Sequence, residues 1–235
     1  MNREGRIGEL FVEWYGAMRD RFGHRNWWPA DSPFEVCVGA ILTQNTAWKN
    51  VVKSIDNLKA AAALDPMRIY EMDRPQLAEL ILPCGYYNVK ANRLQSFVRH
   101  LVEKHAGDLD SLFLPRVEKL REELLSINGI GKETADSIIL YAAYKPIFVV
   151  DAYTRRVLER HGLVPERSTY DSIQAFFHAN LEPSVELFND FHAQFVAVGH
   201  YYCKRTPLCD RCPLGRFKDR KGKIWRAGGT SSRKP

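Results

Sequence analysis

Asp151 is the residue of this sequence best placed for carboxylate chemistry. It follows four consecutive apolar residues, 147–150, and precedes a segment with helical periodicity, 152–161. A carboxylate in that position would be partly desolvated and rigidly held. Asp is also a preferred helix-capping residue. Taken alone, Asp151 therefore has two open roles, a structural cap or a catalytic carboxylate.

A glycine turn precedes Asp151 by twenty residues. Gly129-Ile130-Gly131 lies between two segments with helical periodicity, 117–125 and 134–144. The glycines allow a sharp turn that leaves backbone N–H groups exposed at the start of the second helix. Such amides and the helix dipole bind a phosphate without reading base sequence. A plain helix-helix connection with a glycine C-cap is the alternative interpretation.

Cysteines provide a third candidate chemistry. The chain has five, and three of them, Cys203, Cys209 and Cys212, lie within ten residues. An odd number with this spacing favours a reducing compartment and a metal or cluster site over a disulfide framework. Cys37 and Cys84 stand in apolar surroundings and are interpreted as small buried residues.

The elements that must position these groups are predicted to be helices. Apolar residues recur at three- and four-residue spacing almost throughout, and two-residue alternation is scarce. Proline- and glycine-containing breaks divide the chain into about ten helices, so we expect an all-α fold. Without an apolar run long enough to cross a membrane, or an apolar secretory start, we expect a cytoplasmic, nucleoid-associated protein.

The formal net charge of +6 indicates an anionic partner, but it is unevenly distributed. Residues 216–235 contain eight basic residues against Asp219, which leaves +7 there and −1 in the other 215 residues. This Gly-, Ser- and Arg/Lys-rich tail is interpreted as a disordered arm, either a solubility aid or a DNA-steering segment.

Four ordered motifs resemble the endonuclease III-like helix-hairpin-helix (HhH-GPD) DNA glycosylases. The hairpin 125–135 and the aspartate segment 149–156 are the first two. Residues 41–46, Ile-Leu-Thr-Gln-Asn-Thr, resemble the family's glutamine-bearing helix start. Residues 84–91, Cys-Gly-Tyr-Tyr-Asn-Val-Lys-Ala, resemble its "GLYNxKA" loop. The matching segments extend from about Trp27 to Cys212.

The resemblance implies roles for individual residues. Asp151 would be the catalytic carboxylate that acts on a base flipped out of the duplex. Gln44 and Tyr86 would fill the gap left by that base. The implied DNA-binding set is Gln44, Asn45, Tyr86, Asn88, Lys90, Gly129, Ile130, Gly131, Lys132 and Thr134.

Glu133 decides the expected reaction type. Family members that also cut the strand use a lysine two residues after the second hairpin glycine, where this chain has Glu133. Lys132 is one residue earlier, about 100° away around the helix, so it should not replace that lysine. We therefore expect a monofunctional glycosylase with water as the nucleophile, and Glu133 near the catalytic pocket.

Tryptophans indicate the substrate class. Trp27-Trp28-Pro29 and Trp48 resemble the aromatic signature of the 3-methyladenine DNA glycosylase branch, as does 129–133. A methylated purine is cationic and already a good leaving group, so stacking and cation–π attraction can replace specific hydrogen bonds. The same tryptophans could instead belong to the core. The favoured substrate is an alkylated purine rather than an oxidised pyrimidine.

The cysteine loop resembles the family's iron–sulfur loop, with two departures. The first spacing is one residue short, and Lys218 occupies the position of the fourth cysteine. The alternatives are a [4Fe-4S] cluster completed by another ligand, a remnant loop, or zinc held by Cys203, Cys209, Cys212 and His200.

In architecture the resemblance implies two helical domains with DNA in a cleft between them. A helical barrel, 34–144, would end in the hairpin, and 1–33 with 145–214 would form the second domain, followed by the tail 215–235. The expected partner is double-stranded DNA with a damaged base, bound by a monomer. The competing interpretations are an oxidised-pyrimidine glycosylase/AP lyase, a non-catalytic DNA-binding module and a redox protein.

Overall fold

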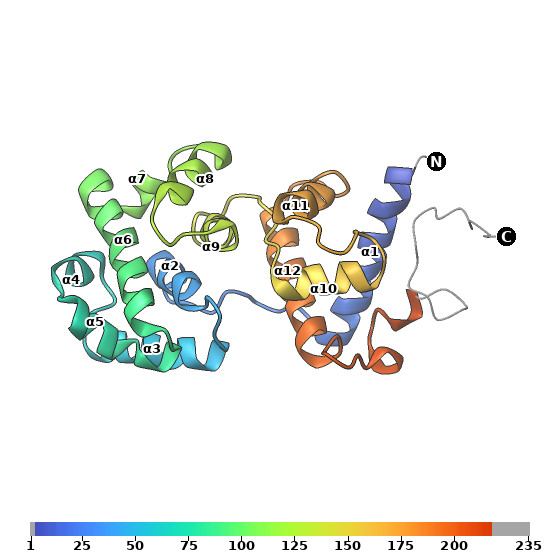
Figure 1. Cartoon of the computed structure of the whole chain (residues 1–235). Helices are drawn as coiled ribbons and strands as arrows, with labels where there is room; N and C mark the ends of the chain where they lie inside the picture. The colour runs from blue at the N-terminus through green and yellow to red at the C-terminus, as the bar shows by residue number, and fades with distance from the viewer. Residues whose placement is uncertain (1–2, 218–235) are drawn as a thin grey trace. The chain divides into compact units, whose positions relative to one another are not determined.

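The chain is an all-α protein, as the sequence predicts. The computed structural model describes residues 3–217, and in that range it contains twelve α-helices and no β-strand (Figure 1). The expectation of about ten helices was too low by two, because two segments between predicted breaks each contain two helices: α2 (Pro33–Leu42) and α3 (Trp48–Ala60), and α7 (Leu109–Phe113) and α8 (Val117–Ser126). No helix within 3–217 is both long and apolar enough to cross a membrane.

The chain forms two compact units, and each is considered by itself. Unit 1 comprises residues 1–27 and 148–235, and unit 2 comprises residues 28–147. The division expected from the sequence placed the barrel at 34–144. In the structure, unit 2 extends a few residues further at both ends and includes Trp28.

Unit 2 is built around two buried helices. Every residue of α2 from Phe34 to Leu42 is buried, and α6 buries Leu94, Phe97, Val98 and Leu101. The hydroxyl of Ser32 accepts a hydrogen bond from the Glu35 N–H and, with Pro33, begins α2. The elements are α2 (Pro33–Leu42), α3 (Trp48–Ala60), α4 (Pro66–Glu71), α5 (Arg74–Leu80), a 3₁₀ turn (Leu82–Cys84), α6 (Tyr87–His105), α7 (Leu109–Phe113), α8 (Val117–Ser126), α9 (Lys132–Ser137) and a π-helical turn (Ile138–Ala142).

Unit 1 joins the two ends of the chain around an aromatic core. Helix α12 packs against both α1 and α10 (Figure 1). The rings of Phe148 and Phe177 stack with centroids 3.6 Å apart, and Phe11 stacks on Phe177 at 4.8 Å. The elements are α1 (Arg3–Phe22), α10 (Ala152–Arg160), α11 (Tyr170–His178), α12 (Val185–Tyr201) and two 3₁₀ turns (Cys209–Arg211 and Gly215–Phe217).

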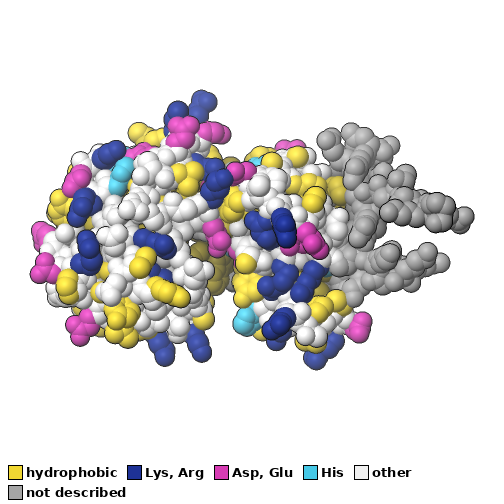
Figure 2. Space-filling model, viewed as in Figure 1, with side chains coloured by type: hydrophobic (Ala, Val, Ile, Leu, Met, Phe, Trp, Pro, Cys, Tyr) yellow, Lys and Arg dark blue, Asp and Glu magenta, His cyan; other side chains and the backbone are white. Residues whose placement is uncertain are grey.

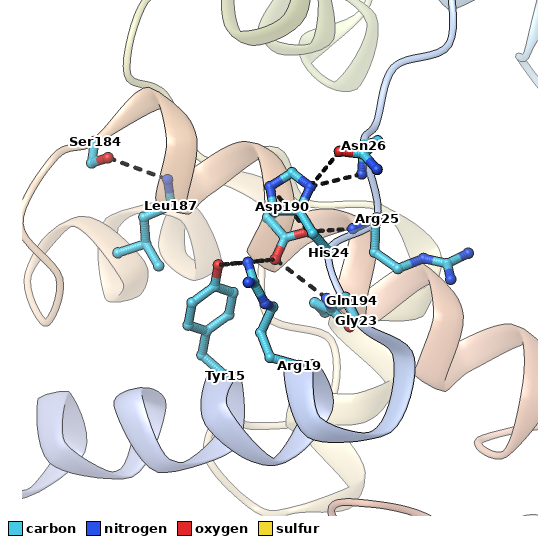
Figure 3. Close-up of polar contacts among 10 residues, drawn as sticks. All are labelled: Tyr15, Arg19, Gly23, His24, Arg25, Asn26, Ser184, Leu187, Asp190 and Gln194. Atoms are coloured by element: carbon cyan, nitrogen blue, oxygen red, sulfur yellow. Dashed lines mark hydrogen bonds and ion pairs between the residues drawn. The ribbon is translucent and has the colours of Figure 1, made fainter.

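A buried carboxylate fastens the N-terminal segment to α12. Asp190 accepts hydrogen bonds from the Arg25 N–H (2.8 Å), the Tyr15 hydroxyl (2.9 Å) and Arg19 (3.2 Å) (Figure 3). Gln194, one turn later, donates to the Gly23 carbonyl at 2.7 Å. Burial alone would raise the pKa of Asp190, but these hydrogen bonds outweigh it and lower the pKa.

Candidate functional site

The glycine turn joins α8 to α9 as a tight hairpin. Gly129 has φ +90°, and the Ile130 N–H donates to the Ile127 carbonyl at 3.1 Å. Arg121 of α8 makes a two-pronged ion pair with the buried carboxylate of Asp136 on α9, at 2.7 and 3.1 Å. This pair locks the two helices together behind the turn.

The tip of the hairpin is accessible while its apolar residue is buried. Gly131 and Lys132 are exposed, whereas the Ile130 side chain is only 5% exposed. Gly131 caps α9 with no side-chain hydrogen bond. Any contact that Ile130 makes with DNA must therefore use its backbone.

Gln44 is attached to the hairpin. Its side-chain amide donates to the Gly129 carbonyl at 3.1 Å and to the Thr134 hydroxyl at 2.9 Å, and its oxygen accepts from Arg93 of α6. A Cβ at position 129 would lie 2.2 Å from Cγ of Arg93, so only glycine fits beneath that side chain. Gln44 thus links two predicted motifs, the segment 41–46 and the hairpin. Arg93, which was not anticipated from the sequence, contacts Gln44.

Two residues of the expected DNA-binding set protrude on strained backbone. Tyr86 has φ +47° and is 75% exposed, and Asn45 has φ +53° and is also exposed. A left-handed conformation is rare for a tyrosine and persists only where the surrounding structure imposes it. Asn88 is exposed in the first turn of α6.

Lys90 belongs to the expected DNA-binding set, but its side chain makes contacts inside the protein. Its side chain is buried, and its ammonium donates to the carbonyls of Leu42 (2.9 Å) and Cys84 (2.8 Å). Burial lowers its pKa. The Lys90 side chain is therefore not available to contact DNA, since it is buried and its ammonium donates to two backbone carbonyls. It instead ties together the segments that end just before Gln44 and Tyr86.

Aromatic residues cluster in unit 2. The Trp28 ring meets Trp48 edge-on at 5.1 Å and lies 5.3 Å from Tyr141, which belongs to the π-helical turn. Trp28 also packs closely on α2, since a Cβ at Gly39 would come within 3.2 Å of the indole. Tyr141 was not anticipated from the sequence. Trp27 is half-buried and Pro29 exposed.

Glu133, from which the sequence predicts the reaction type, lies at the start of α9. Lys132 and Glu133 are the first two residues of this helix, and both are exposed. The helix turns by about 100° between them, so the two side chains leave it in different directions. The two residues therefore lie on a helix, as expected from the sequence, and Lys132 does not point in the direction of Glu133.

Asp151 caps α10. One carboxylate oxygen accepts the Thr154 N–H at 2.7 Å, and the side chain is 13% exposed. All four residues of the preceding run, 147–150, are buried, and Phe148 is part of the aromatic core. The predicted cap is confirmed, and the carboxylate is both held in place and partly accessible.

His192 lies beside Asp151, which the sequence did not indicate. It belongs to α12, is buried, and has its Nε2 3.9 Å from the Asp151 carboxylate. Burial lowers the pKa of His192 although the Asp151 charge acts in the opposite direction. Burial thus favours the neutral form of the imidazole beside Asp151.

Two arginines hold the cysteine loop against α10. Arg156 donates to the carbonyls of Cys203 (2.6 Å) and Gly199 (3.1 Å). Arg160 donates to the carbonyls of Lys204 (2.6 Å) and Arg205 (3.2 Å) and lies 3.3 Å from the Cys203 sulfur. The loop is therefore joined to the helix that begins at Asp151.

The three thiols fit part of the donor set of an iron–sulfur cluster. Burial raises the pKa of Cys212, and the charges of Cys203 and Cys209 act in the same direction. A [4Fe-4S] cluster takes four thiolates, and Lys218, at the fourth position, lies outside the described residues. The described residues thus include three of the four thiolate donors that such a cluster takes.

The described residues do not bring the donors of the zinc alternative within ligand distance of one another. Tetrahedral zinc with bonds of about 2.3 Å to sulfur brings its ligand atoms within roughly 4 Å of one another. Within residues 3–217, one group of three or more metal-binding side chains has all its ligand atoms within 4.8 Å, and it is His100, His105 and Glu123. His200 and the three cysteines are not part of it.

Charged side chains of both signs are present on the faces visible in Figure 2. Lys and Arg side chains are spread over the visible face of each unit, with Asp and Glu among them (Figure 2). The basic tail to which the sequence analysis assigned the positive charge lies mostly outside the described residues. The hairpin amides therefore stay the phosphate ligands that the sequence predicts.

Comparison with known proteins gives a consistent result. Residues 38–183 match the HhH-GPD superfamily of base excision DNA repair proteins. A protein of Methanocaldococcus jannaschii named as a DNA repair glycosylase is 45% identical over 216 residues, which cover 89% of this chain and 96% of that protein. Endonuclease III of Thermotoga maritima is 31% identical and covers 81% of this chain and 86% of its own length.

Solved structures agree in fold. A 3-methyladenine DNA glycosylase of H. pylori bound to 1,N6-ethenoadenine is 29% identical, with a TM-score of 0.67, over 85% of this chain and 98% of that one. An endonuclease III–DNA complex is 23% identical, with a TM-score of 0.77, over 95% and 98%. With its hairpin, its capped aspartate and these matches, the chain belongs to the HhH-GPD superfamily of base excision DNA repair proteins.

Proposed function

We propose that this protein is a monofunctional DNA glycosylase that removes alkylated purines, such as 3-methyladenine, from double-stranded DNA. The observation that carries the proposal is the Asp151 carboxylate. It is fixed at the start of α10 by the Thr154 N–H, sits on a buried segment and remains partly accessible. Family membership supplies the reaction class, and the residues supply the finer assignment.

Asp151 would stabilise the charge that develops on the sugar. As the bond between C1′ and the base nitrogen breaks, the base leaves with the bonding electrons and positive charge builds on the sugar. Water then forms the new bond to C1′, and its proton passes to the Asp151 carboxylate. Burial favours the neutral form of His192, which would place no positive charge beside that carboxylate.

The hairpin would hold the DNA backbone. The backbone amides of the exposed residues Gly131 and Lys132 would bind a phosphate at the start of α9. Gln44, Asn45, Tyr86 and Asn88 would contact the duplex where the base has left it. Thr134 would act indirectly, because its hydroxyl accepts from Gln44. Lys90 has no direct role.

The aromatic cluster favours an alkylated purine. Trp28 and Trp48, with Tyr141 behind them, offer π-faces and edges that suit a cationic base. Trp27 and Pro29 adjoin them in the sequence. The similarity to a 3-methyladenine glycosylase supports this choice of substrate.

An endonuclease III-type activity is the second candidate. It is favoured by the 31% identity to an endonuclease III and by the cysteine loop. Against it stands Glu133, which cannot form the Schiff base that lyase chemistry requires. We therefore expect excision without strand cleavage.

A panel of lesions separates the candidates. Duplexes with 3-methyladenine, 7-methylguanine, thymine glycol or uracil are incubated with the protein, and released bases are quantified. We expect release of methylated purines and no covalent complex upon borohydride treatment. Preference for thymine glycol, or efficient borohydride trapping, would establish the second candidate instead.

Asp151→Asn tests the catalytic assignment. We expect the single-turnover rate of excision to fall at least about 100-fold, because the charge that opposes the developing cation is lost. Asn caps helices about as well as Asp, so the free energy of unfolding should change by less than about 1 kcal/mol. Asp20→Asn, at an exposed position of α1, is the matched control. Undiminished excision by Asp151→Asn would refute the role.

For the cysteine loop we propose a [4Fe-4S] cluster held by Cys203, Cys209 and Cys212. Such a cluster would brace the loop that Arg156 and Arg160 fasten to α10. No catalytic step depends on it. Iron and acid-labile sulfide in equal amounts in the purified protein would support the cluster, and their absence would identify the loop as a remnant.

A further inference from the structure

Two histidines and a glutamate converge on one point far from Asp151 in the sequence. His100 and His105 belong to α6, and Glu123 belongs to α8. The Nε2 of His100 lies 2.8 Å from Oε1 of Glu123, and the Nε2 of His105 lies 2.7 Å from the same oxygen. All three ligand atoms lie within 4.8 Å of one another.

The surroundings suit a metal ion better than a surface ion pair. The three side chains are 11%, 13% and 24% exposed, so the cluster is largely shielded from water. The other nitrogen of His105, Nδ1, lies 3.2 Å from the Ser111 hydroxyl on α7. That contact turns Nε2 toward Glu123, as second-shell partners do for metal-bound histidines.

The geometry points to a site for a divalent transition-metal ion of the zinc class, ligated by Nε2 of His100, Nε2 of His105 and the Glu123 carboxylate. Tetrahedral ligation at about 2.0–2.1 Å sets ligand atoms about 3.3 Å apart. The two histidine–glutamate distances need to lengthen by only about half an ångström to reach this value. Imidazole and carboxylate are a donor set that zinc accepts, and water would complete the coordination.

Such an ion would join three helices of unit 2. It would link the last turns of α6 to α8, with α7 held through Ser111, and α8 leads directly into the hairpin turn. The ion would therefore stabilise the hairpin without touching DNA. The site is independent of the proposed activity and of the cysteine loop.

Metal titration of the whole protein tests the site. Apo protein, prepared with chelator, is titrated with Co²⁺ and Zn²⁺, and binding is followed by cobalt absorption and by calorimetry. We expect one equivalent of Co²⁺ bound by nitrogen and oxygen ligands, without the thiolate charge-transfer absorption that binding at the cysteine loop would produce. Zn²⁺ should raise the melting temperature of the apo protein.

Variants identify the ligands. His105→Ala and Glu123→Gln should each weaken Co²⁺ binding more than 100-fold, and Ser111→Ala about tenfold. Glu122→Gln, which removes an exposed carboxylate from the same helix, should leave binding unchanged. Circular dichroism verifies that each variant folds. If a ligand variant does not fold, the weaker Co²⁺ binding expected for Ser111→Ala tests the site instead.

Three outcomes overturn the site. One is that Co²⁺ does not bind, or binds only to thiolate ligands. Another is binding that persists in both ligand variants, and a third is equal weakening by Glu122→Gln. Any of them would make the cluster a metal-free clasp in which both histidines donate to Glu123.

Discussion

The two units hold their candidate functional residues in opposite ways. Asp151 of unit 1 is anchored by an apolar segment, with Phe148 stacked on Phe177 at 3.6 Å. Gln44 and Tyr86 of unit 2 are anchored by polar contacts, chiefly the Lys90 ammonium on two backbone carbonyls. A close-packed core holds a carboxylate rigidly, whereas hydrogen bonds to a loop backbone can fix a strained conformation at its exposed tip.

Truncation of the aromatic anchor should have the largest effect on stability. We expect Phe148→Ala to lower the free energy of unfolding by about 3–5 kcal/mol, because it opens a cavity in the unit 1 core. Single-turnover excision should slow while DNA affinity changes little, since the hairpin is in unit 2. Urea unfolding and DNA-binding titrations measure the two effects. Phe148→Leu, which refills part of the space, should be intermediate, and weakened DNA binding without slower excision would contradict the comparison.

Removal of the polar anchor should affect DNA binding instead. Lys90→Met leaves the Leu42 and Cys84 carbonyls without the ammonium, at a cost of about 2–4 kcal/mol in unfolding free energy. The Kd for duplex DNA should rise, because the segments that lead to Gln44 and Tyr86 lose their common tie. Lys119→Met, at a site whose side chain is 73% exposed, is the control. An unchanged Kd for Lys90→Met would show that the tie is dispensable.

Unit 1 has a polar anchor of its own, and pH tests it. The pKa of Asp190 is lowered in the folded state, so its contribution to stability is present above the unfolded pKa, near pH 4, and is lost as pH falls through the folded value. Asp190→Asn should therefore cost about 1–3 kcal/mol at neutral pH and progressively less below about pH 4. Urea unfolding at several pH values checks this, with Asp20→Asn as the control. A constant difference across the range would refute it.

The smallest effect on stability is expected at Tyr86. Because its φ is +47°, Tyr86→Gly relieves a strained backbone, and the unfolding free energy should change by less than about 1 kcal/mol. Excision should nevertheless slow, because the exposed ring is lost. Tyr86→Asn, which also tolerates this conformation, should behave likewise. A large loss of stability in either variant would mean that the ring, rather than the loop backbone, holds this segment.

Local features of the molecule were predictable from the sequence. The cap at Asp151, the buried run before it and the all-helical fold depend on residue type and spacing, and the structure confirms them. The hairpin was found for the same reason, since two glycines beside helical segments permit few other conformations. Such features need only neighbours along the chain.

Long-range features were not predictable. A lysine in an exposed-looking loop motif predicts a solvated side chain, and nothing near Lys90 reveals that the Leu42 carbonyl is its partner. His192 approaches Asp151 from a different helix, and Arg93 reaches Gln44 from α6. Each arises from tertiary packing, which periodicity does not encode.

The arginine contacts of α10 should protect the position of the cysteine loop against oxidants. Arg156 and Arg160 hold the cysteine loop through backbone carbonyls, and those bonds do not depend on the state of the sulfurs. Loss of an iron–sulfur cluster from the loop would therefore leave the loop attached to α10 by these hydrogen bonds. If the loop holds a cluster that peroxide removes, Asp151 should stay in position and excision should continue at an unchanged rate.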